Sequence, residues 1–258
     1  RRNEAANLDW DGLLEIVCRK VAVAERQGQP FTSVGRKATV KASNWMVRNF
    51  LYHGEATTVF GDGGAGKSRF CLALVLSIQT GEDIIEGFTP VQTGPVLYLD
   101  WESNEDRLDA RIKAICRGAG IETTEIGYRA CTEPLQDQVE EICRYCQSEG
   151  IVAIVVDSVE MAMAGTKEVG GDANDSAVKL YAALRMIGRS ALLIDHVAKN
   201  GDLTTGPRRA YGSIFKGNLA RMAFELRLAT DTIARQGELH IGLFHTKRND
   251  DGHLLRPL

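Results

Sequence analysis

The sequence has no long apolar run. Nowhere in its 258 residues does a stretch approach the roughly 18 apolar residues that a transmembrane helix needs. The polar start, Arg1-Arg2-Asn3-Glu4, also lacks the apolar segment of a secretory signal peptide. These absences favour a cytoplasmic protein with no membrane partner. Because the first residue is not Met, we expect the chain to be a piece of a longer protein.

The sequence also lacks a strong net charge and a second Cys-x-x-Cys pair. A net charge of −3 excludes a protein that is basic overall, so any contact with nucleic acid must come from local loops. Of the six cysteines, Cys143 and Cys146 form one Cys-x-x-Cys pair, without a second pair or a histidine at ligand spacing. We therefore expect reduced thiols, as in a cytosolic protein, rather than a zinc or redox site.

The composition divides the chain into a short N-terminal part and a large domain. Residues 8–26 predict an amphipathic helix, and the polar stretch 27–42 is typical of a linker. We therefore expect an appendage over residues 1–42 and a core domain over residues 43–258. The helix could pack on its own core or on a neighbouring subunit. Its apolar stripe comprises Trp10, Leu13, Leu14, Val17, Val21 and Ala24.

From residue 45 onward, strand-like runs alternate with helical segments. This alternation predicts an α/β domain with a mainly parallel twisted sheet and helices on both faces. No helix fits between the last two strands, which favours an antiparallel hairpin at one sheet edge. The expected strands are 56–60, 95–100, 127–130, 151–157, 190–195, 222–229 and 238–244, and the expected helices are 67–79, 105–119, 135–149 and 174–188.

One segment matches a complete phosphate-binding pattern. Residues 61–68 read G-x-x-x-x-G-K-[ST] and lie between a β-branched run and a helix. The glycine loop and the helix N-terminus present backbone N–H groups to a phosphate. Lys67 is expected to reach the β- and γ-phosphates, and the Ser68 hydroxyl to ligate Mg²⁺. We predict that a nucleoside triphosphate contacts Gly61, Asp62, Gly63, Gly64, Ala65, Gly66, Lys67, Ser68 and Arg69.

Acidic residues end two other expected strands. Asp157 follows an apolar run, as the Walker B aspartate does, and is predicted to hold Mg²⁺ through a water shared with Ser68. Glu102 lies just past the strand that ends at Asp100, where a carboxylate can orient and deprotonate the attacking water. Capping of the helix that begins near Asn104 is the alternative role for Glu102. Asp100 is then a supporting hydrogen-bond group.

These segments resemble the RecA-type P-loop ATPases, and most closely the RepA-type hexameric replicative helicases. The resemblance runs from about residue 45 to residue 249 and implies ATP, Mg²⁺, single-stranded DNA and a homo-oligomer, a hexameric ring. It also implies that His196 senses the γ-phosphate. The family pattern has two histidines where Asp195-His196 stands, and a purely structural His196 is the alternative. The matching segments are 45–47, 99–105, 154–159, 171–175, 195–199 and 210–213.

The C-terminal run 244–249 resembles the basic strand end that DnaB- and RepA-type motors present to the ATP of the next subunit. An arginine acting there in trans makes hydrolysis depend on assembly. Arg248 is the candidate and Lys247 the second choice. A solvated basic turn is the alternative.

Two segments without strand or helix patterns could reach a central channel, namely 163–176 and 199–217. In the second, basic residues alternate with Tyr211 and Phe215, a mixture that can follow a single-stranded backbone and stack on its bases. A flexible surface loop is the alternative. The candidate contacts are Lys199, Arg208, Arg209 and Lys216.

Three functions fit these motifs. The first is an ATP-hydrolysing motor on single-stranded DNA, a replicative-type helicase or the helicase domain of a primase–helicase. The second is a DNA-binding or regulatory ATPase of the same fold that does not unwind DNA. The third is a P-loop kinase, which requires an arginine-rich lid and an acceptor pocket that the sequence does not display.

Overall fold

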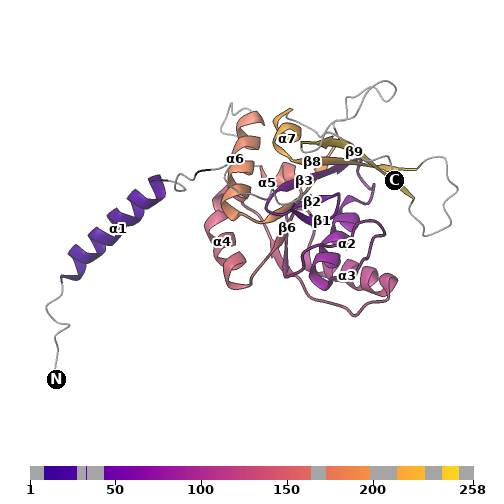
Figure 1. The fold of residues 1–258 in the computed structure, drawn as a ribbon, viewed down its shortest axis with the longest axis horizontal. Helices are drawn as coiled ribbons and strands as arrows, with labels where there is room; N and C mark the ends of the chain where they lie inside the picture. Colours follow the sequence, from indigo (N-terminus) through magenta and orange to yellow (C-terminus); the bar gives the residue numbers. More distant parts are fainter. Residues whose placement is uncertain are drawn as a thin grey trace. The chain divides into compact units, whose positions relative to one another are not determined.

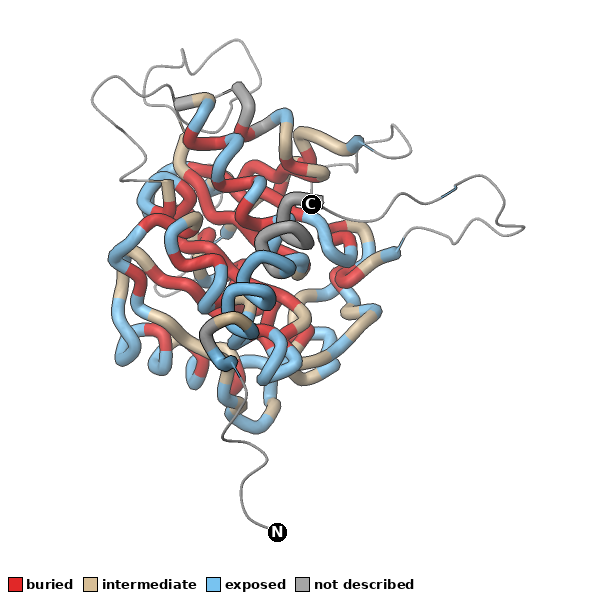
Figure 2. Tube along the Cα trace, turned by 90° about the vertical axis from the view of Figure 1, so that its left-hand side faces the viewer, coloured by how far each residue is buried: buried red, intermediate tan, exposed pale blue. Residues whose placement is uncertain are grey.

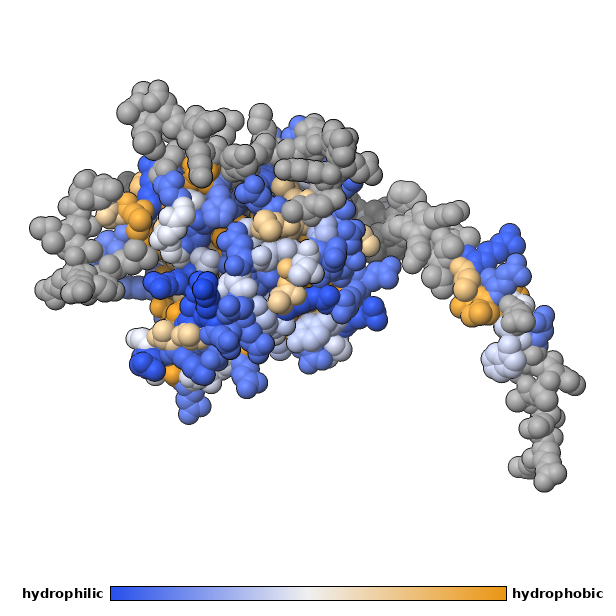
Figure 3. Space-filling view, turned by 180° about the vertical axis from the view of Figure 1, so that it is seen from behind, coloured by the Kyte–Doolittle hydropathy of each residue, from blue (hydrophilic) through white to orange (hydrophobic). Residues whose placement is uncertain are grey.

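The computed structural model describes residues 9–27, 33, 44–163, 173–197, 214–229 and 240–249. The chain divides into two units, residues 1–42 and 43–258. Among the described residues of the first unit there is one helix, α1 (Trp10–Gln27), close to the expected bounds. Its apolar side chains Trp10, Leu13, Leu14, Ile16 and Val17 are exposed (Figure 3). The expected linker lies outside the described residues apart from Gln27 and Ser33.

The second unit is built on a sheet that has seven strands in the described residues (Figure 1). Their order is β5-β4-β6-β7-β3-β8-β9, and neighbours run parallel apart from β8 and β9, which are antiparallel. The predicted α/β fold with an antiparallel edge hairpin is thus confirmed. The strands are β3 (Ala56–Gly61), β4 (Val96–Asp100), β5 (Gly127–Ala130), β6 (Ala153–Asp157), β7 (Ser190–His196), β8 (Met222–Leu228) and β9 (Ile241–Arg248).

Helices cover both faces of this sheet, and each face has its own apolar core. On one face, α2 (Lys67–Thr80) and α3 (Glu105–Ala119) pack with the short hairpin β1 (Trp45–Val47) and β2 (Leu51–Tyr52). On the other face lie η2 (Leu135–Gln138), α4 (Val139–Ser148) and α6 (Ala173–Ile187). Figure 2 shows that burial is concentrated in the strands and along one side of the helices. Strands β3, β4 and β6 are buried throughout, as expected for central parallel strands.

Some expected bounds were wrong for local reasons. The expected strand 151–157 begins only at Ala153, because the N–H of Ile151 bonds to the Cys146 carbonyl and that of Val152 to the Pro95 carbonyl. The expected helix 135–149 opens as a 3₁₀ turn after Pro134, whose extended ψ of 148° cannot continue a helix backwards. The last strand lies later than expected, at 241–248 instead of 238–244.

The ends of both segments that we expected to be loops are helical. Helix α6 already begins at Ala173, inside the expected loop 163–176, and α7 (Ile214–Leu219) occupies the end of the expected loop 199–217. A short helix, α5 (Val159–Ala162), lies between β6 and the first of these segments. Residues 164–172 and 198–213 lie outside the described residues. Among the helices that the structure describes, none combines the length and apolar character that crossing a bilayer requires.

Candidate active site

The phosphate-binding loop lies between β3 and α2, at the carboxyl end of a central strand. Gly61 is required by its neighbour, because a Cβ there would lie 2.3 Å from the Leu226 carbonyl oxygen of β8. Gly64 and Gly66 have φ values of 79° and 90°, in the left-handed region that favours glycine. Gly66 caps α2 without a side chain, so no side-chain oxygen takes up the first N–H groups of the helix. They are therefore available for an anion.

Lys67 is folded into this loop. Its side chain is buried, and its Nζ donates to the carbonyl oxygens of Gly61 and Asp62, both at 2.9 Å. Burial lowers the pKa of Lys67, while the nearby carboxylates, first Asp157 and then Glu102, act in the opposite direction. These acids keep a cation favourable at the centre of the site.

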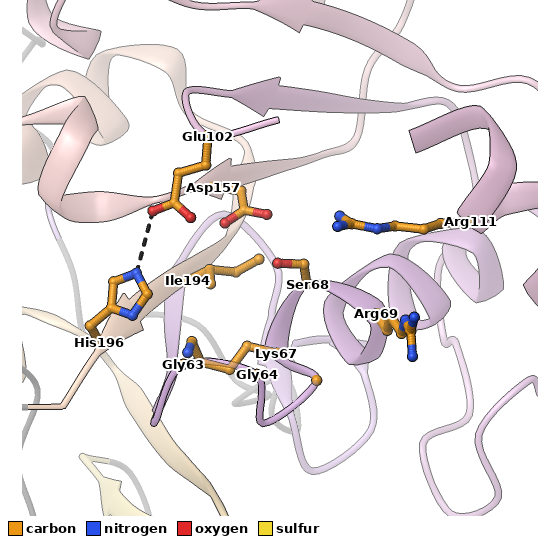
Figure 4. Close-up of a pocket in the computed structure, with 11 residues that line it drawn as sticks. Gly63, Gly64, Lys67, Ser68, Arg69, Glu102, Arg111, Asp157, Ile194 and His196 are labelled. Atoms are coloured by element: carbon orange, nitrogen blue, oxygen red, sulfur yellow. Dashed lines mark hydrogen bonds and ion pairs between the residues drawn. The ribbon is translucent and has the colours of Figure 1, made fainter. Parts of the chain in front are cut away.

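Asp157 ends β6 beside the loop and is almost fully buried. Tyr98 of β4 donates its hydroxyl to Asp157 Oδ2 at 2.5 Å. Burial raises the pKa of Asp157, and hydrogen bonds from Tyr98 and Ser68 oppose that rise. The Ser68 hydroxyl and the carboxylate are thus neighbours, at the front of the loop (Figure 4).

This pair of oxygen donors fits Mg²⁺. No cluster of three or more His, Cys, Asp or Glu ligands occurs in the part of the chain that the structure describes. Magnesium does not need one, because it is commonly held by one or two protein oxygens together with waters and substrate phosphates. Ser68 and Asp157 are therefore the residues that would hold the ion, and its chemistry would be to neutralise phosphate charge.

A tight turn carries Glu102 to the mouth of the loop. Asp100 is buried at the end of β4, and its Oδ1 accepts from the N–H groups of Glu102 at 3.0 Å and Ser103 at 2.8 Å. The N–H of Trp101 donates to the Asp157 carbonyl at 2.7 Å, which ties the turn to the neighbouring strand. Asn104 caps α3 by accepting from the Arg107 N–H. The helix cap is therefore Asn104, and Glu102 is left to face the cavity.

The Glu102 carboxylate is held by Ser158, which directly follows β6, and by His196 of β7. Its Oε1 accepts from the Ser158 hydroxyl and lies 3.3 Å from His196 Nε2 (Figure 4). The Glu102 side chain stays 40% exposed and that of His196 36% exposed, so both remain open to water and ligand. The parallel strands thus bring together at one edge three residues that are far apart in the sequence.

These residues line one cavity of about 340 Å³. Arg111, which the sequence reasoning missed, also lines it from α3. Its guanidinium points toward Ser68 and Asp157 (Figure 4). The available signal was that Arg111 adjoins the buried stripe of α3, so its side chain leaves the helix beside the core. The full lining is Gly63, Gly64, Gly66, Lys67, Ser68, Arg69, Glu102, Arg111, Asp157, Ile194 and His196.

Arg248 and Lys247 lie away from this cavity. Arg248 is the last residue of β9, and its guanidinium stacks over the Trp45 ring at 5.4 Å. Lys247 Nζ donates to the carbonyls of Asn218 at 2.7 Å and Ala220 at 2.6 Å, at the C-terminal end of α7. Both residues therefore lie within the β-sheet unit rather than in a free basic turn.

One of the four expected nucleic-acid contacts is placed differently from the prediction. Lys216 lies on α7, where its side chain is 3% exposed and pairs with Asp195 at 3.2 Å. It would have to leave this ion pair to contact a nucleic acid. Lys199, Arg208 and Arg209 lie outside the described residues.

Comparisons with known proteins bear on both the family and the fold. A family model described as an AAA domain matches residues 24–202. Among solved structures, a KaiC-like protein from the hyperthermophilic archaeon Pyrococcus horikoshii OT3 is similar in fold, with a TM-score of 0.54 and 16% sequence identity. The similarity covers 82% of this chain and 87% of that one. No curated protein matches the sequence.

Proposed function

Because this chain belongs to the AAA domain family and has a RecA-type P-loop ATPase core, we propose that it is an ATP-hydrolysing motor on single-stranded DNA. Its activity is that of a replicative-type helicase, or of the helicase domain of a longer primase–helicase. The motor works as a homo-oligomer, a hexameric ring, with ATP and Mg²⁺ at the phosphate loop.

The observation that carries the hydrolytic part is the position of Glu102. Its carboxylate lines the same cavity as the phosphate loop and is fixed by Ser158 and His196. A carboxylate held there can orient and deprotonate a water for attack on the γ-phosphate. His196 touches this carboxylate, so a change at the γ-phosphate can pass to the end of β7. Lys67 and Arg111 supply positive charge along the phosphates.

The position of Arg248 supports action on a second copy of the chain. Arg248 pairs with Met222, which pairs with Thr57, whereas the phosphate loop begins at Gly61. Four residues of strand separate the two levels, a distance of about 13 Å. Arg248 therefore lies at the opposite end of the sheet from its own phosphate loop. An arginine in that place acts on ATP only across an interface between subunits.

The DNA part of the proposal rests on the sequence. Lys199, Arg208 and Arg209 follow the strand end that carries His196, with Tyr211 close behind. Basic and aromatic side chains in this order suit a single-stranded backbone and its bases. Because this segment is joined to β7, a displacement of His196 on ATP binding or hydrolysis would be transmitted to it.

A second candidate is a regulatory RecA-like ATPase that binds DNA or assembles on ATP without unwinding. The similarity to a KaiC-like protein, which extends over most of both chains, fits this candidate about as well as it fits the motor. The same cavity serves both functions. They differ in whether hydrolysis moves the protein along DNA.

The deciding experiment measures ATP turnover against protein concentration, with and without single-stranded DNA, and unwinding of a forked duplex. The motor predicts turnover that rises more steeply than concentration, stimulation by DNA, and strand separation. Glu102→Gln, which should bind ATP without turnover, is the control for contaminating activity. Cooperative turnover without DNA stimulation or unwinding would favour the regulatory ATPase.

The trans role of Arg248 has its own test. Arg248→Ala and Glu102→Gln should each lose about 10³-fold or more in turnover. Mixed in equal amounts, they should regain activity, because about a quarter of the interfaces then combine an intact Glu102 with an intact Arg248. A mixture as inactive as its components would exclude action across the interface.

A further inference from the structure

A buried ion pair lies directly behind the active site. Asp195, at the end of β7, and Lys216, on α7, face each other with Nζ 3.2 Å from Oδ2 and 3.3 Å from Oδ1. Their side chains are 0% and 3% exposed. Burial raises the pKa of Asp195, and the Lys216 ammonium is the first group that opposes this rise. Neither residue lines the phosphate cavity.

The pair is connected to the catalytic carboxylate by a short chain of contacts. Asp195 Oδ1 accepts from the backbone N–H of His196 at 2.9 Å. The imidazole of His196 reaches Glu102 at 3.3 Å, and Ser158 bonds to the same carboxylate oxygen. The Asp195 carboxylate therefore helps to fix the backbone of His196, and the position of that backbone determines where the His196 ring meets Glu102.

Lys216 is itself held on a fixed backbone. The Tyr181 hydroxyl of α6 donates to the Lys216 carbonyl at 3.0 Å and lies 3.4 Å from the Thr58 hydroxyl of β3. Two residues further on, the Asn218 carbonyl accepts from Lys247 of β9. Two elements of the core, α6 and β9, thus anchor α7. The ammonium of Lys216 is therefore presented to Asp195 from an anchored backbone, and its side chain is buried rather than on the surface.

We propose that Lys216 is a positioning residue for ATP hydrolysis, which through Asp195 holds His196 in place beside Glu102. The inference rests on the proposed hydrolysis but not on DNA or on ring formation. A buried pair is a poor way to gain stability, because removing two charges from water offsets most of their attraction. A buried ion pair can instead be retained because it holds the carboxylate in one orientation.

The test compares two variants. Lys216→Met keeps much of the side-chain volume but leaves Asp195 buried and unpaired. We expect a fall in kcat of about 10- to 100-fold, the size of effect that a displacement of about 1 Å produces. Binding of a fluorescent ATP analogue should stay within about threefold, because the residues that line the cavity are unchanged. Because Lys216→Met leaves a buried charge unpaired, it should lower the resistance to urea. The double variant Asp195→Asn/Lys216→Met removes both charges and should restore that resistance.

The double variant separates positioning from stability. Positioning predicts that its kcat stays low, because the amide that replaces the Asp195 carboxylate has no ammonium to orient it. A purely structural pair predicts that kcat recovers together with the resistance to urea. Leu184→Ala, on the buried side of α6, is the matched control for destabilisation and should keep kcat at 25 °C. Lys113→Met, in an exposed pair on α3, is the control for the substitution itself.

Two results would overturn the positioning role. One is a double variant with wild-type kcat, and the other is a Leu184→Ala protein that loses as much turnover as Lys216→Met. A wild-type protein without any ATP turnover would instead refute the proposed function. A wild-type protein that hydrolyses ATP without DNA stimulation would refute the motor and leave this comparison intact.

Discussion

The hydrogen bond between Tyr98 and Asp157 should contribute strongly to stability. Tyr98 is 1% exposed, and its hydroxyl lies 2.5 Å from Asp157 Oδ2. Tyr98→Phe removes one oxygen atom and leaves the ring in its packing. The carboxylate then loses a charge-assisted donor in a place that water does not reach. Such bonds contribute about 1.5–3 kcal/mol.

Thermal and urea unfolding measure this effect. For a domain of this size, each kcal/mol changes the Tm by about 2–4 °C, so Tyr98→Phe should lower it by about 3–12 °C. Tyr128→Phe is the matched control. Tyr128 lies on the more exposed strand β5, and its hydroxyl is 3.5 Å from the Asp100 carboxylate. At that length the bond is weak, and its loss should cost about 0.5 kcal/mol. Equal costs for the two variants would refute the reasoning.

The pH dependence supplies a second check. Burial raises the folded pKa of Asp157 above its unfolded value, so ionisation lowers the stability at neutral pH, and the Tyr98 hydroxyl reduces that loss. Tyr98→Phe should raise this pKa further. The cost of the substitution is then full above the folded pKa and shrinks as pH falls through it, so it should be larger at about pH 7.5 than at about pH 4. A cost independent of pH would show that the carboxylate is not the partner that matters.

Three further predictions concern the phosphate cavity, its loop and the C-terminal hairpin. Arg111→Ala should weaken ADP binding about tenfold or more, measured by fluorescence titration, because its guanidinium lines the phosphate cavity; unchanged affinity would remove it from the site. Gly61→Ala should destabilise the protein by about 2 kcal/mol, since the new methyl group meets the Leu226 carbonyl, whereas Gly63→Ala, which meets nothing within 4 Å, should not. Burial lowers the pKa of His245 in the folded protein, so on acidification the unfolded state binds the proton first. Stability should therefore fall as the pH drops from about 6.5 through the folded pKa. His245→Phe should flatten that part of the curve of stability against pH.

Much of the phosphate site could be predicted from local signals. The loop at 61–68 needs its glycines for backbone reasons that act within a few residues, and Asp157 follows an apolar strand. The alternation of strands and helices then requires a parallel sheet, whose strand ends lie at one edge. Proximity of Glu102, Asp157 and His196 follows from this rule without coordinates.

The remaining parts of the site depend on packing between distant elements. Arg111 enters the cavity because α3 lies along α2, and its spacing alone does not reveal that neighbour. Lys216 looked like a surface cation in a basic segment, yet Asp195 draws it into the interior from 21 residues away. The sequence alone does not show which residue a charged side chain will pair with.

The sequence by itself determined the kind of site, because a phosphate loop is built from residues that are neighbours in the chain. Tertiary structure alone decided which side chains complete it and which end of the sheet Arg248 occupies. The register of β9 on β8 set that position, and register depends on how whole strands bury their faces.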